Sequence, residues 1–299
     1  MYKDLIKSTP AFDSIPKNAQ SYLFCGFDAL ACDLFAHHFI ADQTNKPQSA
    51  DIIHLPKSDK VLVADIDFLT QSSIISPLEL PHKYFVVKNA DSMTESAANK
   101  LLKTLEEPPK KVKIILLASS PHAVLPTIKS RCAIVNIPPF DQAKLDKIID
   151  TDFAANKHAA MAKELSMGSL ERMKKALDGE FEKKVSAVFE MLLFMRKSSQ
   201  IVQFSGLFLA FKDDLADLIW ILEVALADAA KFLCKAELTF KSRRSDIEQI
   251  CLFYNVETVL KMEQVFAHLK QRLRFSGNVQ SIIDQLLFSL LQTRQKNAT

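Results

Sequence analysis

Arg131 is the residue of the first 180 positions whose type and setting best suit chemistry on a phosphate. It stands in the tripeptide Ser130-Arg131-Cys132, after a short turn and directly before an apolar run. Residues 1–180 contain 20 lysines but only two arginines, Arg131 and Arg172. A lysine would serve any solvated role, whereas the planar guanidinium of an arginine can grip a phosphate with two parallel hydrogen bonds. Arg131 is therefore a candidate phosphate ligand, and the alternative is an ordinary cation at the surface or at a strand edge.

The other residue types that often carry chemistry lack a suitable arrangement. Glu106 and Glu107 are adjacent at the end of a predicted helix, so we expect surface charges that point in different directions rather than a catalytic pair. His37 and His38 are adjacent too, and the remaining histidines lack the spacing of metal ligands. Five cysteines without a Cys-x-x-Cys spacing favour reduced thiols over disulfides or a zinc module. The sequence thus predicts no metal site and no nucleophilic enzyme.

The scarcity of glycine argues against a nucleotide-binding loop. The chain contains five glycines, and residues 27–167 contain none. A loop that cradles phosphates needs several glycines to aim its backbone N–H groups at the ligand. Neither a Walker A loop nor a dinucleotide-binding fingerprint can therefore be placed in the first half of the chain, and the sequence predicts no nucleotide-binding residues.

The elements that must position Arg131 follow the order strand, helix, strand, turn and strand. Apolar runs at Tyr84–Val87 and Val112–Leu117 are predicted strands, and the helix between them ends at Pro108-Pro109, because the residue before a proline is pushed out of the α region. Ala133–Ile137 supplies the third strand, directly after the tripeptide. Connections too long for hairpins indicate a parallel sheet covered by helices. The apolar face of the predicted helix consists of Ala97, Ala98, Leu101, Leu102 and Leu105.

The rest of the chain divides into an α/β part and a helical part. Further strands are predicted at Tyr22–Cys25, Ile52–Leu55 and Val61–Ala64, and further helices at Asp28–Ile40 and Ile66–Ser73. Helical patterns then take over, with three short helices predicted at Asp141–Asp150, Asp152–Leu165 and Ser169–Leu177. About five more helices are expected from residue 180 onward, with connections at Lys241–Ser245 and Phe275–Asn278.

Composition and charge narrow the classes of function. A hydrophobic content of 48% and a charged content of 24% are typical of an ordinary globular protein. No apolar run reaches the length of a membrane span, and the first residues lack the apolar core of a signal peptide, so we expect a cytoplasmic protein without a membrane partner. The formal net charge of +3 is small for a protein that binds nucleic acid on its own.

Two segments resemble a known family in the order of their residues. Ala97–Pro109 (AANKLLKTLEEPP) and Leu125–Cys132 (LPTIKSRC) resemble the clamp-loader subunits of the AAA+ superfamily, and most closely the delta' family of bacterial DNA polymerase III. The resemblance is specific over residues 83–139 and looser over the rest of the chain. It implies an α/β AAA+ core in residues 1–139, a three-helix lid domain in 140–180 and an all-α collar or oligomerisation domain in 181–299.

The resemblance also implies that this chain has no ATPase site of its own. ATP-using members of the family need a phosphate loop, an acidic pair after a strand and a lid arginine. The corresponding positions hold Cys25–Ala31 without Gly-Lys-Thr, then Lys88-Asn89, and then Glu171 beside Arg172. Mg²⁺ needs carboxylate ligands and the hydrolytic water needs an orienting acid, and these positions supply neither. The family's zinc-binding cysteines are missing from residues 41–50 as well, so no cofactor is expected, and ATP and Mg²⁺ would be bound by a neighbouring subunit.

For Arg131, the resemblance implies an arginine finger, an arginine that acts on the nucleotide of an adjacent subunit. Ser130 and Cys132 would position it, and the phosphate-sensing role of Ser119 would be vestigial. Lys100 and Lys103 are candidate contacts to duplex phosphates, with a solvated helix face as the alternative.

The function implied is that of a non-hydrolysing stator subunit. Its partners would be the gamma/tau ATPase subunits and the delta subunit, with the sliding clamp and primed DNA reached through the assembled complex. Two alternatives remain open at this point: an ATPase with an unorthodox site, and an AAA-like scaffold of some other complex.

Overall fold

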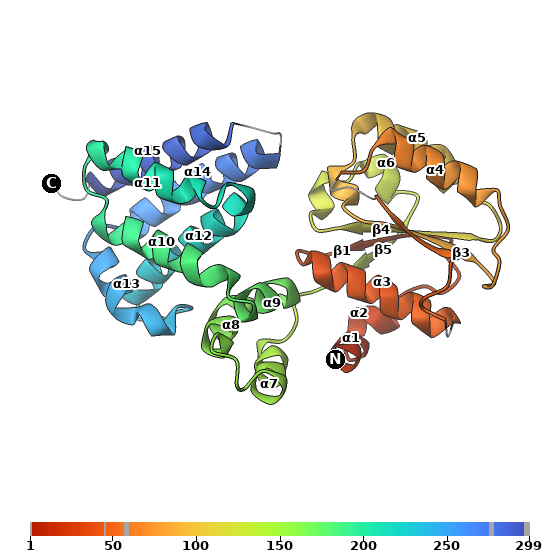
Figure 1. The fold of residues 1–299 in the computed structure, drawn as a ribbon, viewed down its shortest axis with the longest axis horizontal. Coiled ribbons are helices and arrows are strands. Elements are labelled where there is room, and N and C mark those ends of the chain that lie inside the picture. The colour runs from red at the N-terminus through yellow and green to blue at the C-terminus, as the bar shows by residue number, and fades with distance from the viewer. Residues whose placement is uncertain (1, 45, 57–59, 275–277, 296–299) are drawn as a thin grey trace. The chain divides into compact units, whose positions relative to one another are not determined.

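The computed structural model describes residues 2–44, 46–56, 60–274 and 278–295, and Figure 1 shows its fold. The chain divides into two compact units. The first comprises Met1–Ala154 and Ser166–Lys174, and the second comprises Ala155–Leu165 and Lys175–Thr299. The division into three domains at residues 139 and 180 stays a prediction.

The first unit is built on a five-stranded sheet in the order β2-β3-β4-β1-β5. Every neighbouring pair of strands is parallel, so the predicted parallel sheet is confirmed. The central strands are buried along their whole length, which explains why their sequences are continuously apolar rather than alternating. The strands are β1 (Ser21–Cys25), β2 (Ile52–Leu55), β3 (Lys83–Val87), β4 (Val112–Ala118) and β5 (Ala133–Asn136).

Helices cover both faces of this sheet. One face carries α3 (Ala29–Thr44), and the other carries α4 (Val63–Ser73), α5 (Glu95–Glu106) and the short α6 (Pro126–Lys129), as Figure 1 shows. The hydroxyl of Thr94 caps the start of α5 by accepting from Ala97 N at 3.3 Å. The expected apolar face of this helix packs into the core beneath it. The first unit also contains α1 (Lys3–Lys7), α2 (Pro10–Asp13), α7 (Gln142–Asp152) and the first residues of α9 (Leu170–Leu177).

Three of the sequence predictions for residues 28–165 are wrong in detail. Val61–Ala64 is not a strand, because the backbone N–H of Leu62 donates to the Asp65 carboxylate at 2.9 Å and α4 begins at Val63. Helix α3 continues to Thr44, beyond its predicted end at residue 40. The helix predicted over residues 152–165 is shortened to α8 (Ala159–Ser166), because Asn156 forms a turn in which its side chain accepts from His158 N at 2.8 Å.

The second unit is helical throughout its described part. After residue 179 it contains six α-helices where about five are predicted, and the expected connection at residues 241–245 is partly helical. Of the expected connection at 275–278, residues 275–277 lie outside the described residues. No helix in the described ranges is long and apolar enough to cross a membrane. The six helices are α10 (Glu180–Phe194), α11 (Ile201–Leu209), α12 (Leu215–Leu233), α13 (Arg244–Cys251), α14 (Val256–Arg274) and α15 (Val279–Gln295).

Arg294 joins the last helix of this unit to the end of α10. Its Nη1 donates to Leu192 O at 2.6 Å and to Met195 O at 3.0 Å, and its guanidinium lies 3.8 Å from the centre of the Phe253 ring. Only 4% of the residue is exposed. The last carbonyls of an α-helix lack partners within the helix, so this buried arginine satisfies groups that water cannot easily reach.

Candidate functional site

Arg131 lies in the turn between α6 and β5, where the sequence predicts it. Pro126 begins α6, and the backbone N–H of Arg131 donates to Ile128 O at 3.0 Å. The side chain of Ile128 is buried in the core of the first unit. The turn is therefore fixed from below by packing and from within by hydrogen bonds, and Arg131 is held at the surface on a rigid base.

The guanidinium of Arg131 is held by two elements. Its Nε donates to Glu106 Oε1 at 2.8 Å, and its Nη2 lies 2.5 Å from the same oxygen. Its Nη1 donates to Thr127 O at 2.9 Å and to Ser130 Oγ at 3.1 Å. The side chain remains 32% exposed. Glu106 was expected to be plain surface charge, and the sequence reasoning missed this ion pair because nothing in the spacing of residues 106 and 131 indicates that they meet.

Ser130 and Cys132 differ in what they do for Arg131. The Ser130 hydroxyl contacts the guanidinium directly and also donates to Thr127 O at 3.1 Å. Cys132 packs against the core of the first unit, and burial raises the pKa of its thiol to about 12. A thiol that stays protonated at neutral pH is a poor nucleophile, so Cys132 can contribute packing but no covalent chemistry.

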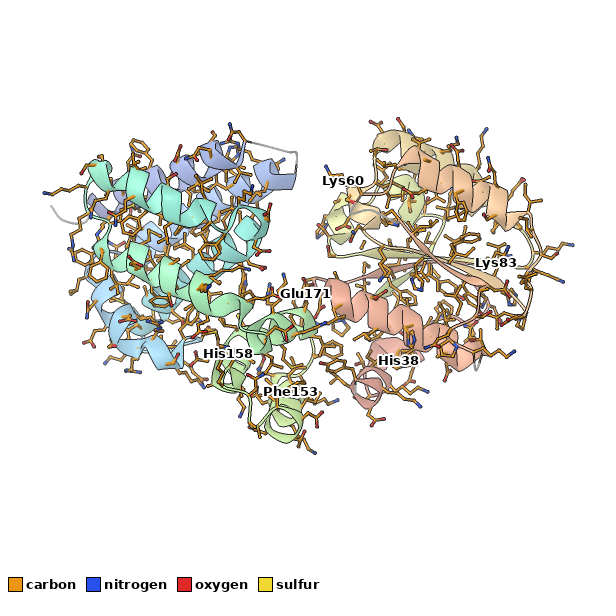
Figure 2. All side chains as sticks on the ribbon, in the orientation of Figure 1. His38, Lys60, Lys83, Phe153, His158 and Glu171 are labelled. Atoms are coloured by element: carbon orange, nitrogen blue, oxygen red, sulfur yellow. The ribbon has the colours of Figure 1, made fainter. Side chains whose placement is uncertain are left out.

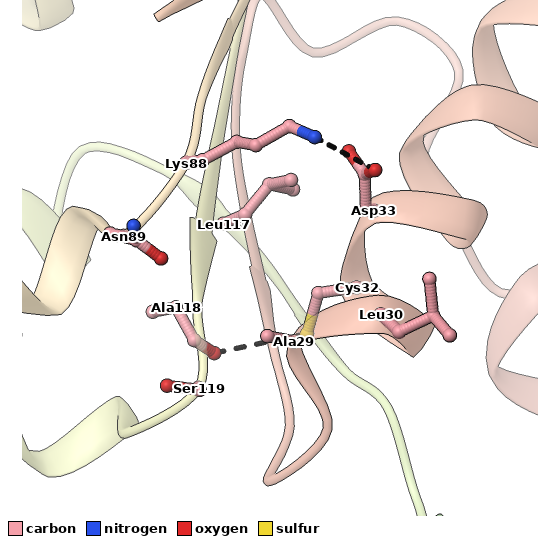
Figure 3. A pocket seen from close by; sticks show the side chains of 9 residues that line it. All are labelled: Ala29, Leu30, Cys32, Asp33, Lys88, Asn89, Leu117, Ala118 and Ser119. Atoms are coloured by element: carbon pink, nitrogen blue, oxygen red, sulfur yellow. Dashed lines mark hydrogen bonds and ion pairs between the residues drawn. The ribbon is translucent and has the colours of Figure 1, made fainter. Parts of the chain in front are cut away.

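A cleft of about 210 Å³ lies at the carboxyl ends of β1, β3 and β4, which is the usual ligand-binding edge of a parallel sheet. Figure 3 shows its lining, which mixes short apolar side chains with a few polar ones. No glycine contributes to this lining. The residues are Ala29, Leu30, Cys32, Asp33, Lys88, Asn89, Leu117, Ala118 and Ser119.

Lys88, Asp33 and Ser119, three polar residues of this cleft, have side-chain partners within the chain. Lys88 Nζ lies 2.8 Å from Asp33 Oδ2, so its charge is neutralised within the chain (Figure 3). Ser119, the residue expected to be a vestigial phosphate sensor, donates to Asp91 Oδ2 at 3.1 Å, and Ser120 N donates to the same oxygen at 2.8 Å. A triphosphate would have to displace these partners.

Asp28 occupies the start of α3, where a phosphate loop would present its N–H groups. Its Oδ1 accepts from Ala31 N at 2.9 Å. Its Oδ2 accepts from Ser169 Oγ at 3.0 Å and from Leu170 N and Glu171 N at 2.6 and 3.3 Å. The carboxylate is buried and sits at the N-terminal ends of α3 and α9, both of which favour an anion. The chain thus supplies its own negative charge where a nucleotide-binding protein would receive phosphate.

Gly26 and Phe27, which precede Asp28 in the β1–α3 loop, also contact neighbouring segments closely. A Cβ at Gly26 would lie 2.7 Å from Ile137 O, so the backbone passes too close to the following segment for any side chain. The Arg172 guanidinium lies 5.4 Å from the centre of the Phe27 ring, and Glu171 (labelled in Figure 2) occupies the position that the resemblance assigns to a lid arginine. Arg172, the residue after Glu171, therefore contacts the β1–α3 loop through Phe27.

The sequence and the fold of this chain are similar to those of known proteins. A family model described as "DNA polymerase III, delta subunit" matches residues 16–141. DNA polymerase III subunit delta' of Bacillus subtilis is 24% identical to 95% of this chain, and the match covers 88% of that protein. The chain is thus similar to DNA polymerase III delta' subunits over most of its length.

Two further matches extend the comparison. Subunit delta' of Haemophilus influenzae is 30% identical over a match that covers 40% of this chain and 37% of that protein. A solved DNA polymerase III gamma subunit-related protein from Thermotoga maritima aligns over 98% of both chains with 20% identity and a TM-score of 0.51. That likeness confirms the predicted fold class, an AAA+-like α/β core followed by helical domains.

The two lysines predicted to contact DNA lie on the exposed side of α5. Lys100 forms an ion pair with Asp67 of α4. Lys103 is exposed one turn further along the helix. Their role toward DNA stays a prediction. Among the described residues, no three His, Cys, Asp or Glu side chains are arranged to hold a metal ion.

Proposed function

We propose that this protein is a stator subunit of a bacterial replicative clamp loader. In this role it hydrolyses no ATP itself and helps to load the sliding clamp on primed DNA. The observation that carries the proposal is the similarity to a delta' subunit over 95% of this chain and 88% of the relative. The proposed partners are the gamma/tau ATPase subunits and the delta subunit, reached in the cytoplasm, with residues 181–299 forming the collar.

Arg131 is the residue that acts in this proposal. It would reach across a subunit interface to the terminal phosphate of ATP bound by the neighbour and stabilise the charge that spreads over the transferring phosphoryl group. Two features support this role. The side chain of Arg131 is about one-third exposed on a rigid turn, and Arg131 lies outside the residues that line the chain's own cleft.

The same proposal assigns no ATP or Mg²⁺ to the chain's own cleft. The buried carboxylate of Asp28 stands at the helix starts that would bind phosphate, and Lys88 is committed to Asp33. Phosphate and carboxylate repel each other at short distance, so the observed arrangement disfavours an ATPase with an unorthodox site here.

The test is reconstitution with the partner subunits. Arg131→Ala is expected to leave folding and assembly intact, because the residue is at the surface, and to lower the ATPase rate stimulated by DNA and clamp. Arginine fingers in switch enzymes raise the rate by a factor of roughly 10³–10⁵. Hydrolysis at the neighbouring ATP site that Arg131 completes should therefore almost stop. The total ATPase rate of the complex should fall by the fraction that this one site contributes. Arg131→Lys keeps the charge but loses the planar fork of the guanidinium, so it should lower the stimulated ATPase rate nearly as much as Arg131→Ala.

Two results would count against the proposal. Failure of the wild-type chain to associate with the gamma/tau and delta subunits would remove the clamp-loader role. An unchanged stimulated rate with Arg131→Ala in a fully assembled complex would remove the finger role while leaving the subunit assignment in place.

A further inference from the structure

The hydrogen bonds of Arg131 leave little of its guanidinium for a phosphate. A guanidinium has five N–H donors. Arg131 directs Nε and Nη2 to Glu106 Oε1, and it directs Nη1 to Thr127 O and Ser130 Oγ. A two-bond grip on a phosphate uses a pair of donors on one edge of the fork. The edge formed by Nε and Nη2 is occupied by the carboxylate of Glu106.

The position of Glu106 is set by the fold rather than by its own side chain. It is the last residue of α5, which ends before Pro108-Pro109 and packs against α6. Leu105, immediately before it, is buried in the core, and Ile128 fixes α6 in the same core. Both ends of the ion pair are therefore carried by anchored backbone, so the meeting of Glu106 with Arg131 is a built feature of this face.

The strength of the pair suits a reversible contact. The side chains of Arg131 and Glu106 are 32% and 48% exposed, and ion pairs with such access to solvent contribute little to stability. A terminal phosphate carries about two negative charges at neutral pH and offers more acceptor oxygens than a carboxylate. The same fork recognises both groups. A phosphate brought close to Arg131 would therefore replace Glu106 without a large cost.

We propose that Glu106 is a latch for Arg131, which rests on the finger role proposed above. In the absence of a correctly placed phosphate, Glu106 takes the place of that phosphate and neutralises the guanidinium. When the neighbouring subunit closes around ATP, the phosphate displaces Glu106 and Arg131 becomes available. Glu106 is thus a positioning residue that keeps ATP hydrolysis low until DNA and clamp bring the subunits into the productive geometry.

The experiment measures ATP hydrolysis by the reconstituted complex, first without and then with primed DNA and clamp. Glu106→Gln removes the charge while keeping the shape, and it is expected to raise the unstimulated rate about two- to five-fold, the range set by an exposed ion pair. The stimulated rate should change less, so the ratio of stimulated to unstimulated rate falls. Glu106→Ala should change the rates in the same direction.

The matched control is Glu107→Gln. Glu107 is adjacent, exposed and equally charged, and its backbone N–H continues the helix by donating to Lys103 O. It should behave as the wild type. An unstimulated rate for Glu106→Gln that equals that of Glu107→Gln, or that falls below it, would overturn the latch.

Arg131→Ala separates failure of the latch from failure of the finger. If it leaves the stimulated rate unchanged, the finger role is wrong and the latch is wrong with it. If it lowers the rate while Glu106→Gln has no effect, only the latch is wrong. The double variant Glu106→Gln with Arg131→Ala should match Arg131→Ala alone, because a latch acts only through the residue it holds. If Glu106 instead had a purely structural role, its substitution would also change the rate when Arg131 is absent. The effects of the two substitutions on the rate would then add in the double variant.

Discussion

A buried carboxylate costs stability unless its oxygens are well hydrogen-bonded. Asp28 meets that condition with donors from two segments: Ala31 N in its own helix, and the hydroxyl and backbone groups of residues 169–171. This one side chain therefore ties the end of the β1–α3 loop to the start of α9 within the first unit. The sequence shows that Gly-Lys-Thr is missing here, but it does not show what replaces it, because the donors are about 140 positions away.

Asp28→Ala should cost more than an ordinary surface substitution. It leaves buried N–H groups at the starts of two helices without an acceptor, so we expect a loss of about 2–4 kcal/mol in the free energy of unfolding. Urea denaturation measures this loss, and hydrogen exchange at Leu170 and Glu171 should become faster. Asp13→Ala, at an exposed position, is the control and should change stability by less than about 0.5 kcal/mol. Equal stabilities for the two variants would contradict the role given to Asp28.

Arg131 could be predicted from the sequence, whereas its partner Glu106 could not. The rarity of arginine and the tripeptide setting single out Arg131. Its partner stands 25 positions earlier, on a helix that meets α6 only because both helices cover one face of the sheet. A contact of this kind depends on tertiary packing, which no local pattern encodes.

At the scale of elements, the strands were predictable and the helix boundaries were less so. Strands buried on both faces are continuously apolar, and β1, β3 and β4 lie within a residue or two of their predicted bounds. Val61–Ala64 has the same composition as a strand, but the Asp65 side chain starts a helix instead. A single hydrogen bond of this kind outweighs the weak preference of a short apolar run.

The end of α10 offers a test of how one helix is fixed by another. Arg294→Met keeps the bulk of the side chain but leaves Leu192 O and Met195 O buried without their donor. We expect the free energy of unfolding to fall by about 2–4 kcal/mol, measured by urea denaturation. Lys197→Met, which removes an exposed cation just beyond the end of α10, is the control. A loss below about 0.5 kcal/mol for Arg294→Met would show that the carbonyls find other partners.

At the scale of the whole molecule, the resemblance of two short segments was enough to predict the similarity to delta' subunits and the fold class, and the comparisons confirm both. The three-domain division, the finger and the DNA contacts stay predictions. The finger and the DNA contacts concern surfaces that would act on other molecules. Such a surface is shaped partly by the partner, which this chain does not contain.

The isolated chain should not respond to nucleotide. A ligand present at 100 times its dissociation constant would add about 2.7 kcal/mol to stability and raise the unfolding midpoint by several degrees. Because Asp28 and the Lys88–Asp33 pair occupy the groups that would bind phosphate, we expect millimolar Mg-ATP to leave the midpoint unchanged in a thermal unfolding experiment. Inorganic triphosphate serves as the control for general anion effects. A rise with ATP but not with triphosphate would show a specific nucleotide site.

The carboxylate of Asp28 has one more consequence. A bound nucleotide is present in proportion to its supply, and it leaves or changes when ATP is hydrolysed. A side chain of the same polypeptide faces its partners at a fixed effective concentration and cannot diffuse away. The contact between the β1–α3 loop and the start of α9 is therefore independent of the cell's ratio of ATP to ADP. In the proposed clamp loader, adjacent ATPase subunits would run through their cycles against a part whose shape does not follow the energy state of the cell.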